Sequence, residues 1–286
     1  EQIAAHCTRL TAIVGSPYLT ERGAVSAAAV LRRGRIDQIV EKQHVSARRE
    51  MGFLSPGTGI ETLFIAGEKV ALVVGDDFRR IRNFPRTAQI IININARRYG
   101  KGVLSRRYSS IHDVAFVQSK TVVFINQVGG SGEIVYDGTS GVMDNNGNLT
   151  LMMKDFAEDF AIYDTDAEHE PCVLPEALYS HDRTPFNFRA AVLGLRDYFH
   201  KNGYTKACVG LSGGIDSSVV VCLAVGALGA ENVKGLMMPS QFSSDDSVED
   251  AKTLLQMTHS LSVWFMEVYG DWGKTDKGWI SLSFVV

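Results

Sequence analysis

Residues 206–218 read KACVGLSGGIDSS, and this stretch decides how the second half of the 286-residue chain folds. Residues 206–211 have the apolar character of a buried strand, and the apolar run 217–228 indicates a helix that ends at Gly229. A second apolar run, 233–238, completes a strand–helix–strand unit, for which a parallel strand pair is expected. The turn after the first strand therefore lies at the carboxyl edge of a parallel sheet, where α/β folds bind ligands.

This turn has the composition of a phosphate-binding loop. Its two adjacent glycines let backbone N–H groups approach an anion closely, and the N-terminus of the following helix adds positive partial charge. Its serine hydroxyls can donate to phosphate oxygens, whereas Asp216 would repel phosphate and is therefore expected to hold Mg²⁺. The candidate ATP-binding residues are Gly210, Leu211, Ser212, Gly213, Gly214, Ile215, Asp216, Ser217 and Ser218.

A glycine-rich turn with a serine N-cap is the alternative explanation of this stretch. However, Ser-Gly-Gly-x-Asp-Ser between an apolar strand and an apolar helix is a more specific combination than a Gly-Gly turn. The turn also lacks the Gly-Lys-Ser ending of a Walker loop, which favours cleavage between the α and β phosphates of ATP over γ-phosphoryl transfer. The sequence therefore predicts a pyrophosphate-binding site for ATP.

The upstream half alternates short apolar runs with turn signals, which implies a layered α/β domain. Residues 155–170 then contain seven acidic residues and no Lys or Arg, and prolines follow, so this part is predicted to connect two domains. We expect a first domain at 1–155, a connector at 156–185 and a second domain at 186–286. The expected strands are 10–14, 25–31, 36–40, 62–66, 70–74, 89–95, 122–126 and 134–143, the last forming a hairpin with 149–153, and the expected helices are 105–119 and 186–202.

Composition excludes several classes of partner and site. The net charge is −3 and no block of basic residues is present, which argues against nucleic-acid and membrane-surface partners. No apolar run approaches the roughly 18 residues of a membrane span. The four cysteines are widely spaced and form no CxxC pair, so neither a zinc site nor a disulfide framework is expected. Reduced thiols in the cytoplasm are the expectation.

Longer stretches resemble one family, the glutamine-dependent NAD synthetases. Residues 207–251 are similar to the start of the synthetase domain of these enzymes, and the upstream half resembles their nitrilase-like glutaminase domain. FINQVGG at 124–130 and DGTS at 137–140 look like late strands of that domain, and EKQH at 41–44 looks like its lysine segment. The resemblance implies a nitrilase-like α-β-β-α sandwich followed by a partial doubly wound parallel-sheet domain, and a chain truncated at both ends.

The resemblance also implies a two-site enzyme. One site would use a Glu-Lys-Cys triad to release ammonia from glutamine. The other would use ATP and Mg²⁺ to adenylate the carboxylate of deamido-NAD, and ammonia would then displace AMP to form NAD. Small molecules are thus the implied substrates, and a homo-oligomer is the implied assembly.

This sequence departs from the family at the glutaminase site. The position that matches the nucleophilic cysteine, after the strand that ends at Val74, is Gly75, and glycine has no side chain with which to form a thioester. Lys42 matches the family lysine, although a solvated lysine at a strand end is the alternative explanation. The family's general-base glutamate matches no residue from Glu1 onward, and Arg97 replaces a substrate-facing serine. Glutamine hydrolysis by this chain is therefore not expected.

The end of the chain also differs from the family. The similarity fades after about Leu255, the three tryptophans all lie at or beyond residue 264, and we expect the atypical tail from about 256 not to continue the sheet. Three interpretations stay open: a NAD synthetase fed by free ammonia, a non-catalytic nitrilase-like fragment or oligomerisation partner, and another pyrophosphate-loop amidotransferase. Residues 120–150 do not resemble the glutaminase domains of asparagine or GMP synthetase, which argues against the third.

Overall fold

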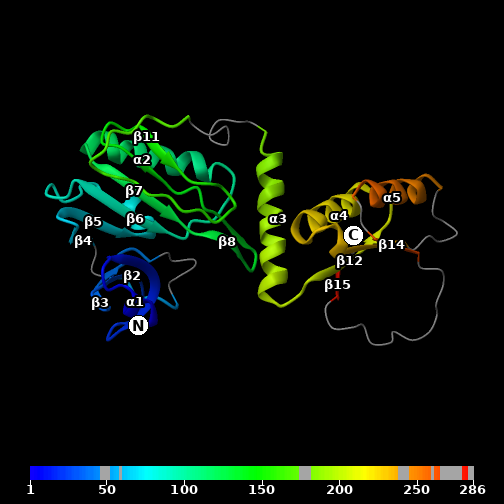
Figure 1. Cartoon of the computed structure of the whole chain (residues 1–286), viewed down its shortest axis with the longest axis horizontal. Coiled ribbons are helices and arrows are strands. Elements are labelled where there is room, and N and C mark those ends of the chain that lie inside the picture. The colour runs from blue at the N-terminus through cyan, green and yellow to red at the C-terminus, as the bar shows by residue number, and fades with distance from the viewer. Residues whose placement is uncertain are drawn as a thin grey trace. The chain divides into compact units, whose positions relative to one another are not determined.

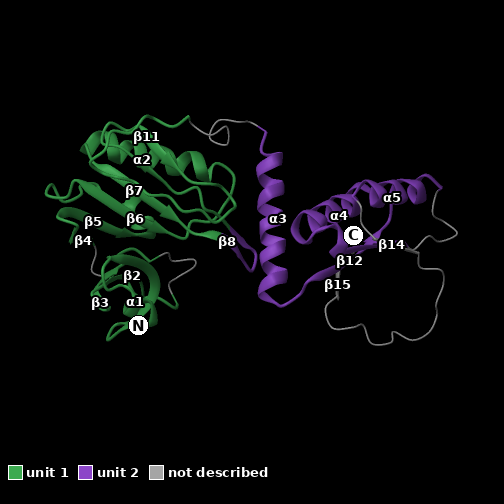
Figure 2. Cartoon of the chain, in the orientation of Figure 1, with its two compact units in different colours: residues 1–128, 136–181 green, residues 129–135, 182–286 purple. Residues whose placement is uncertain are grey.

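The computed structural model describes residues 1–45, 52–57, 60–173, 182–237, 245–258, 261–264 and 279–282, with backbone alone for the last two segments. The chain forms two compact units (Figure 2). The first unit contains residues 1–128 and 136–181, and the second contains residues 129–135 and 182–286.

The first unit contains two sheets (Figure 1). One is antiparallel and has the order β1-β2-β3. The other has the order β11-β10-β7-β6-β5-β4, with β5, β6 and β7 parallel to one another and antiparallel strands at both sides. The strands are β1 (Ala12–Thr20), β2 (Gly23–Arg32), β3 (Arg35–Glu41), β4 (Glu61–Ile65), β5 (Glu68–Val74), β6 (Ile90–Asn95), β7 (Thr121–Asn126), β10 (Gly141–Met143) and β11 (Leu149–Met152).

The two sheets pack face to face because each presents an apolar face with the two-residue period of a strand. Ala28, Val30 and Val40 of the first sheet form one buried cluster with Leu63, Leu72 and Val74 of the second. The neighbouring positions in β2 point the other way, so that Leu31 packs with Ala4 and Cys7 at helix α1 (Gln2–His6).

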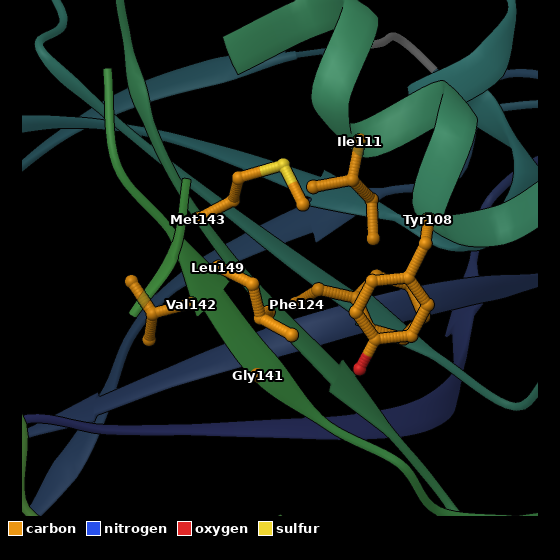
Figure 3. Close-up of a pocket in the computed structure, with 7 residues that line it drawn as sticks. All are labelled: Tyr108, Ile111, Phe124, Gly141, Val142, Met143 and Leu149. Carbon is orange, nitrogen blue, oxygen red and sulfur yellow. The ribbon is translucent and has the colours of Figure 1, made fainter. Parts of the chain in front are cut away.

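Helix α2 (Val103–Gln118) covers the other face of the second sheet. Tyr108 and Ile111 of this helix lie over Phe124, Met143 and Leu149, around an apolar hollow (Figure 3). The Tyr108 hydroxyl donates to the Thr139 carbonyl at 3.1 Å, so the buried ring keeps a partner for its polar atom. The layers therefore run helix, sheet, sheet, helix, which confirms the predicted α-β-β-α sandwich.

The segment predicted as one strand, 134–143, is two strands in the structure. β9 (Ile134–Asp137) ends where Gly138 and Thr139 take positive φ values of 64° and 50°, and β10 begins after them. β9 pairs with β8 (Val128–Ser131), a partner that the sequence did not indicate. The prediction of a hairpin between β10 and β11 is confirmed.

The second unit is a parallel sheet of the order β14-β13-β12-β15 with helices packed against it. Its core contains Val209 and Leu211 of β12, Val221 and Ala224 of α4, and Leu255 of α5. The elements are α3 (Thr184–Lys201), β12 (Lys206–Leu211), α4 (Ile215–Leu228), the short helix η3 (Ala230–Asn232), β13 (Val233–Met237), α5 (Asp245–Met257), β14 (Leu261–Trp264) and β15 (Trp279–Leu282).

The tip of the β8–β9 hairpin belongs to the second unit and contacts α3. The Gly130 N–H donates to Asp197 Oδ2 at 2.7 Å, and Lys201 Nζ donates to the Gly130 carbonyl. A Cβ at Gly130 would lie 3.0 Å from the Gly194 Cα, so the absence of side chains at both positions lets the hairpin approach the helix.

The expectation that the tail from about 256 does not continue the sheet is wrong for two segments. β14 pairs in parallel with β13, and β15 pairs in parallel with β12. Partners in a parallel sheet come from distant parts of the chain, and a four-residue strand is too short to show a period, so local sequence carried no signal for either strand.

Helix α5 packs closely against the sheet at Gly235 of β13. A Cβ there would lie 2.3 Å from Leu255 Cδ2 and 2.9 Å from Leu211 Cδ1. Gly235→Ala is expected to lower the free energy of unfolding of the second unit by about 1–3 kcal/mol, because the added methyl group overpacks the core. Chemical denaturation, with hydrogen exchange in residues 245–257 as the probe, measures this change in the free energy of unfolding. In a Leu255→Ala background the same change is expected to cost less, and an equal cost in both backgrounds would contradict the steric explanation.

Candidate functional site

The turn between β12 and α4 is held in a conformation that requires glycine. Gly213 has a φ of +81°, whereas Gly214 has a φ of −82°. A Cβ at Gly213 would lie 2.2 Å from the Ser247 carbonyl oxygen and 2.7 Å from the Ser247 Cα. The first turn of α5 therefore closes against the loop, and both the backbone angle and the space at position 213 exclude a side chain.

The hydroxyl groups of the loop bond to the loop itself. Ser217 Oγ and Ser218 Oγ each donate to the Gly214 carbonyl at 2.9 Å. The N–H groups make weaker contacts, since Gly214 N–H donates to Ser212 Oγ at 3.3 Å and Ser212 N–H donates to Ser217 Oγ at 3.4 Å. Bonds of this length are readily exchanged for bonds to an anion. The loop thus offers backbone donors at the N-terminus of α4, a 14-residue helix.

Asp216 is exposed in the first turn of α4, beside these donors. In the described part of the chain, no group of three or more His, Cys, Asp and Glu side chains is arranged to hold a metal ion. A single carboxylate fits Mg²⁺, which usually keeps several waters and binds substrate phosphates together with one or two carboxylates. Asp216 is thus chemically suited to hold Mg²⁺ only in company with phosphate.

Lys42 and Gly75 lie together in the first unit. Lys42 follows β3 and is 7% exposed, so it is not the solvated lysine of the alternative explanation. Gly75 begins the short helix η1 (Gly75–Arg79) directly after β5, with a φ of +61°. A Cβ at Gly75 would lie 3.3 Å from Cε, 3.6 Å from Cδ and 3.7 Å from Nζ of Lys42. A side chain at position 75 would therefore meet the lysine ammonium.

Two polar residues that the sequence did not single out support this arrangement. Asn93 is 1% exposed, and its Nδ2 donates to the carbonyls of Val73 and Gly75 at 3.2 Å each. Asp77 is 3% exposed and accepts the backbone N–H groups of Gln43 and His44, at 2.5 and 2.8 Å. Asp77 also contacts His44 Nδ1 at 3.0 Å, so one carboxylate joins η1 to the segment that follows Lys42.

Arg97 brings positive charge to the same end of the second sheet. Its Nη1 lies 3.7 Å from Asp76 Oδ1, and its N–H donates to Asn126 Oδ1 at 2.7 Å. Burial lowers the pKa of Arg97 and repulsion from Arg79 lowers it further, while Asp76 acts in the opposite direction. The residue that stands where the resemblance implies a serine is therefore a partly buried cation.

A buried ion pair holds α2 to the end of β9. Arg107 and Asp137 are 1% and 2% exposed and lie 2.8 Å apart, from Nη2 to Oδ1. Asp137 Oδ1 also accepts from Asn126 Nδ2 at 2.9 Å, and Arg107 Nη1 donates to Thr139 Oγ1. This pair was not predicted, because Arg107 lies among charged and polar residues of the helix and has the sequence context of a solvated side chain.

The three heavy atoms nearest to a Cβ at position 75 all belong to Lys42, and none belongs to a cysteine. All four cysteines are free thiols. Cys208 and Cys222 are half-buried on β12 and α4, and burial raises the pKa of Cys208. A raised pKa keeps a thiol protonated and poorly reactive near neutral pH.

The fold and these geometries define a class: a nitrilase-like α-β-β-α sandwich joined to a parallel α/β unit with a glycine-rich turn between β12 and α4. The NAD synthase family model matches residues 187–270, which extends the match beyond Leu255. The chain is 34% identical to the glutamine-dependent NAD(+) synthetase of Aquifex aeolicus over 90% of this chain and 52% of the relative. The chain is 30% identical to the glutamine-dependent NAD(+) synthetase of Thermotoga maritima over 89% of this chain and 51% of that relative. The chain is thus similar in sequence to the glutamine-dependent NAD(+) synthetases.

Solved structures agree with this relationship. The glutamine-dependent NAD(+) synthetase of Acinetobacter baumannii in complex with ADP aligns with a TM-score of 0.77 and 25% identity, over 92% of this chain and 51% of that one. The enzyme of Cytophaga hutchinsonii has the same fold, with a TM-score of 0.74. The chain spans about half the length of the relatives it matches. Within the described residues, no helix is long and apolar enough to cross a membrane.

Proposed function

We propose that this chain binds ATP with Mg²⁺ at residues 210–218 and acts in the amidation of deamido-NAD. The observation that carries the proposal is the turn after β12, where Gly213 has a φ of +81° and lies against α5. The relatives named as NAD(+) synthetases and the ADP bound to one of them support the choice of nucleotide. The domain of residues 186–286 is the proposed synthetase part, and 1–155 is the proposed nitrilase-like part.

The proposed reaction needs ATP because a carboxylate is a poor acylating agent. A carboxylate oxygen of deamido-NAD attacks the α-phosphorus, pyrophosphate leaves, and ammonia then displaces AMP to form the amide. The loop N–H groups and the N-terminus of α4 are expected to bind the β and γ phosphates, where negative charge develops. Asp216 is expected to hold Mg²⁺, which when bound offsets the charge of the phosphates.

We further propose that the nitrogen comes from free ammonia. Gly75 occupies the position of the family's nucleophile beside Lys42, and without a side-chain nucleophile there no group takes the acyl group of glutamine as ammonia leaves. The glycine at position 75 also favours a second candidate function, that of a non-catalytic nitrilase-like subunit in a homo-oligomer. Both candidates are compatible with a cytoplasmic protein.

The test is NAD formation from deamido-NAD and Mg-ATP on folded protein, with ammonium in one arm and glutamine in the other. Ammonium is expected to support NAD formation, and glutamine is expected to give less than about one thousandth of that rate, because a missing nucleophile removes most of the catalysis. Asp216→Asn in the ammonium arm checks the metal ligand. NAD formation with glutamine would contradict the proposed role of Gly75. If neither arm forms NAD while ATP binds, the non-catalytic candidate is favoured.

A further inference from the structure

We infer that Asp77 is the positioning residue that holds Lys42 against position 75. This inference rests on the proposed assignment of position 75 to the nucleophile, and it concerns which residue keeps that place organised. We assign Asp77 no contact with a substrate. Its carboxylate instead binds the two peptide N–H groups that directly follow Lys42.

The geometry limits how Lys42 can move. Lys42 N–H donates to the Ser26 carbonyl at 2.7 Å, which anchors the residue to β2. The Lys42 carbonyl accepts from Gly57 N–H at 2.7 Å, which anchors it to the segment 52–57. The bonds from Gln43 and His44 to Asp77 then fix the chain that leaves Lys42 relative to η1. Since Gly75 and Asp77 lie on the same short helix, this carboxylate ties the segment that follows Lys42 directly to the element that carries position 75.

The other side of position 75 is fixed independently. Asn93 Nδ2 donates to the Gly75 carbonyl, and Asn95 Nδ2 donates to Asn93 Oδ1. Asn93 therefore holds the backbone of position 75 to β6, while Asp77 holds the lysine segment to η1. Removal of Asp77 is expected to move the lysine and to leave the backbone of position 75 in place.

A thiol introduced by Gly75→Cys reports this distance. A cation within about 4–6 Å favours a thiolate, so Lys42 is expected to lower the pKa of the introduced thiol by about one unit from the ordinary value near 8.5. Among the residues that the structure describes, the charged side chains near it include Lys42, Asp76, Arg79, Arg97 and the Asp77–His44 pair. The pKa is measured from the pH dependence of alkylation by iodoacetamide, in which the thiolate sulfur displaces iodide. Mass spectrometry of the peptide that contains position 75 separates its signal from those of the four native cysteines.

The sign of the shift distinguishes positioning from simple electrostatics. Asp76 and Asp77 are adjacent acids, and removing either negative charge near a thiol should lower the thiol pKa if charge alone acts. In the Gly75→Cys background, Asp76→Asn is the matched control, since Asp76 is 58% exposed, and it is expected to lower the pKa slightly. Asp77→Asn is expected to raise the pKa, because Lys42 is released from the thiol.

Further variants separate the possible failures. Lys42→Met in the same background is expected to raise the pKa by about one unit, and adding Asp77→Asn to it is expected to change nothing more. If Lys42→Met has no effect, the assignment of position 75 fails. If Lys42→Met raises the pKa but Asp77→Asn lowers it as Asp76→Asn does, the positioning role of Asp77 is overturned. Asp77→Glu keeps the charge but displaces it, so it is expected to raise the pKa of the introduced thiol. It replaces Asp77→Asn in this test if Asp77→Asn does not fold.

Discussion

Gly213→Ala is expected to lower the affinity of the chain for Mg-ATP by about 10- to 100-fold, because at least one charge-assisted hydrogen bond of about 1.5–3 kcal/mol is lost. An alanine at a φ of +81° is strained by about 1–2 kcal/mol, and its Cβ would also meet the Ser247 carbonyl at 2.2 Å. The loop and α5 cannot both keep their places, so the backbone donors turn away from the phosphates. Titration calorimetry with Mg-ATP on the full chain measures the affinity.

Gly214→Ala is the matched control for stability in the same loop. Gly214 has a φ of −82°, and a Cβ there would lie 3.4 Å from Ser212 Oγ, which is ordinary contact. Hydrogen exchange in residues 245–257 is therefore expected to accelerate in Gly213→Ala and to stay near the wild-type rate in Gly214→Ala. Equal exchange in both variants would show that α5 does not depend on the conformation of position 213.

The loop was predictable because its signals are local. Apolar strand, paired glycines and apolar helix follow one another within residues 206–228, and each feature acts on its immediate neighbours. The layered sandwich was equally readable, since alternating apolar residues such as Ala28 and Val30 define an inner face. The break between β9 and β10 was missed because Thr139 takes a left-handed conformation, which is uncommon for a residue with a branched Cβ.

The surroundings of Gly75 show the limit of local reasoning. The resemblance indicated Lys42 and Gly75, but nothing in the sequence indicated Asp77 or Asn93, whose partners lie 34 and 18–20 residues away. An acid that follows another acid looks solvated, and Asp76 is indeed exposed while Asp77 is buried. Only the fold shows which of two adjacent carboxylates faces a row of backbone donors. The site residues named from the sequence therefore stay predictions, to be tested by the variants described above.

Asp137→Asn is expected to lower the free energy of unfolding of the first unit by about 3–5 kcal/mol, since it leaves the buried Arg107 without a counter-charge. For a unit of this size that corresponds to a fall in melting temperature of about 10 °C. Asp113→Asn is the control: Asp113 lies on α2, the helix that carries Arg107, it is 77% exposed, and its replacement is expected to change stability by less than about 0.5 kcal/mol. Differential scanning calorimetry of the full chain gives both values.

A paired replacement tests whether the charge itself is responsible. Arg107→Met combined with Asp137→Leu removes both charges, and such replacements are often neutral or stabilising, so the double variant is expected to recover much of the lost stability. If the double variant is as unstable as Asp137→Asn, the hydrogen bonds to Asn126 and Thr139 matter more than the ion pair. Loss of these hydrogen bonds would also affect the surroundings of Gly75, because Asn126 accepts the Arg97 N–H and donates to the Arg97 carbonyl. The Arg107–Asp137 pair would then act chiefly by holding the segment that carries Arg97 beside Asp76.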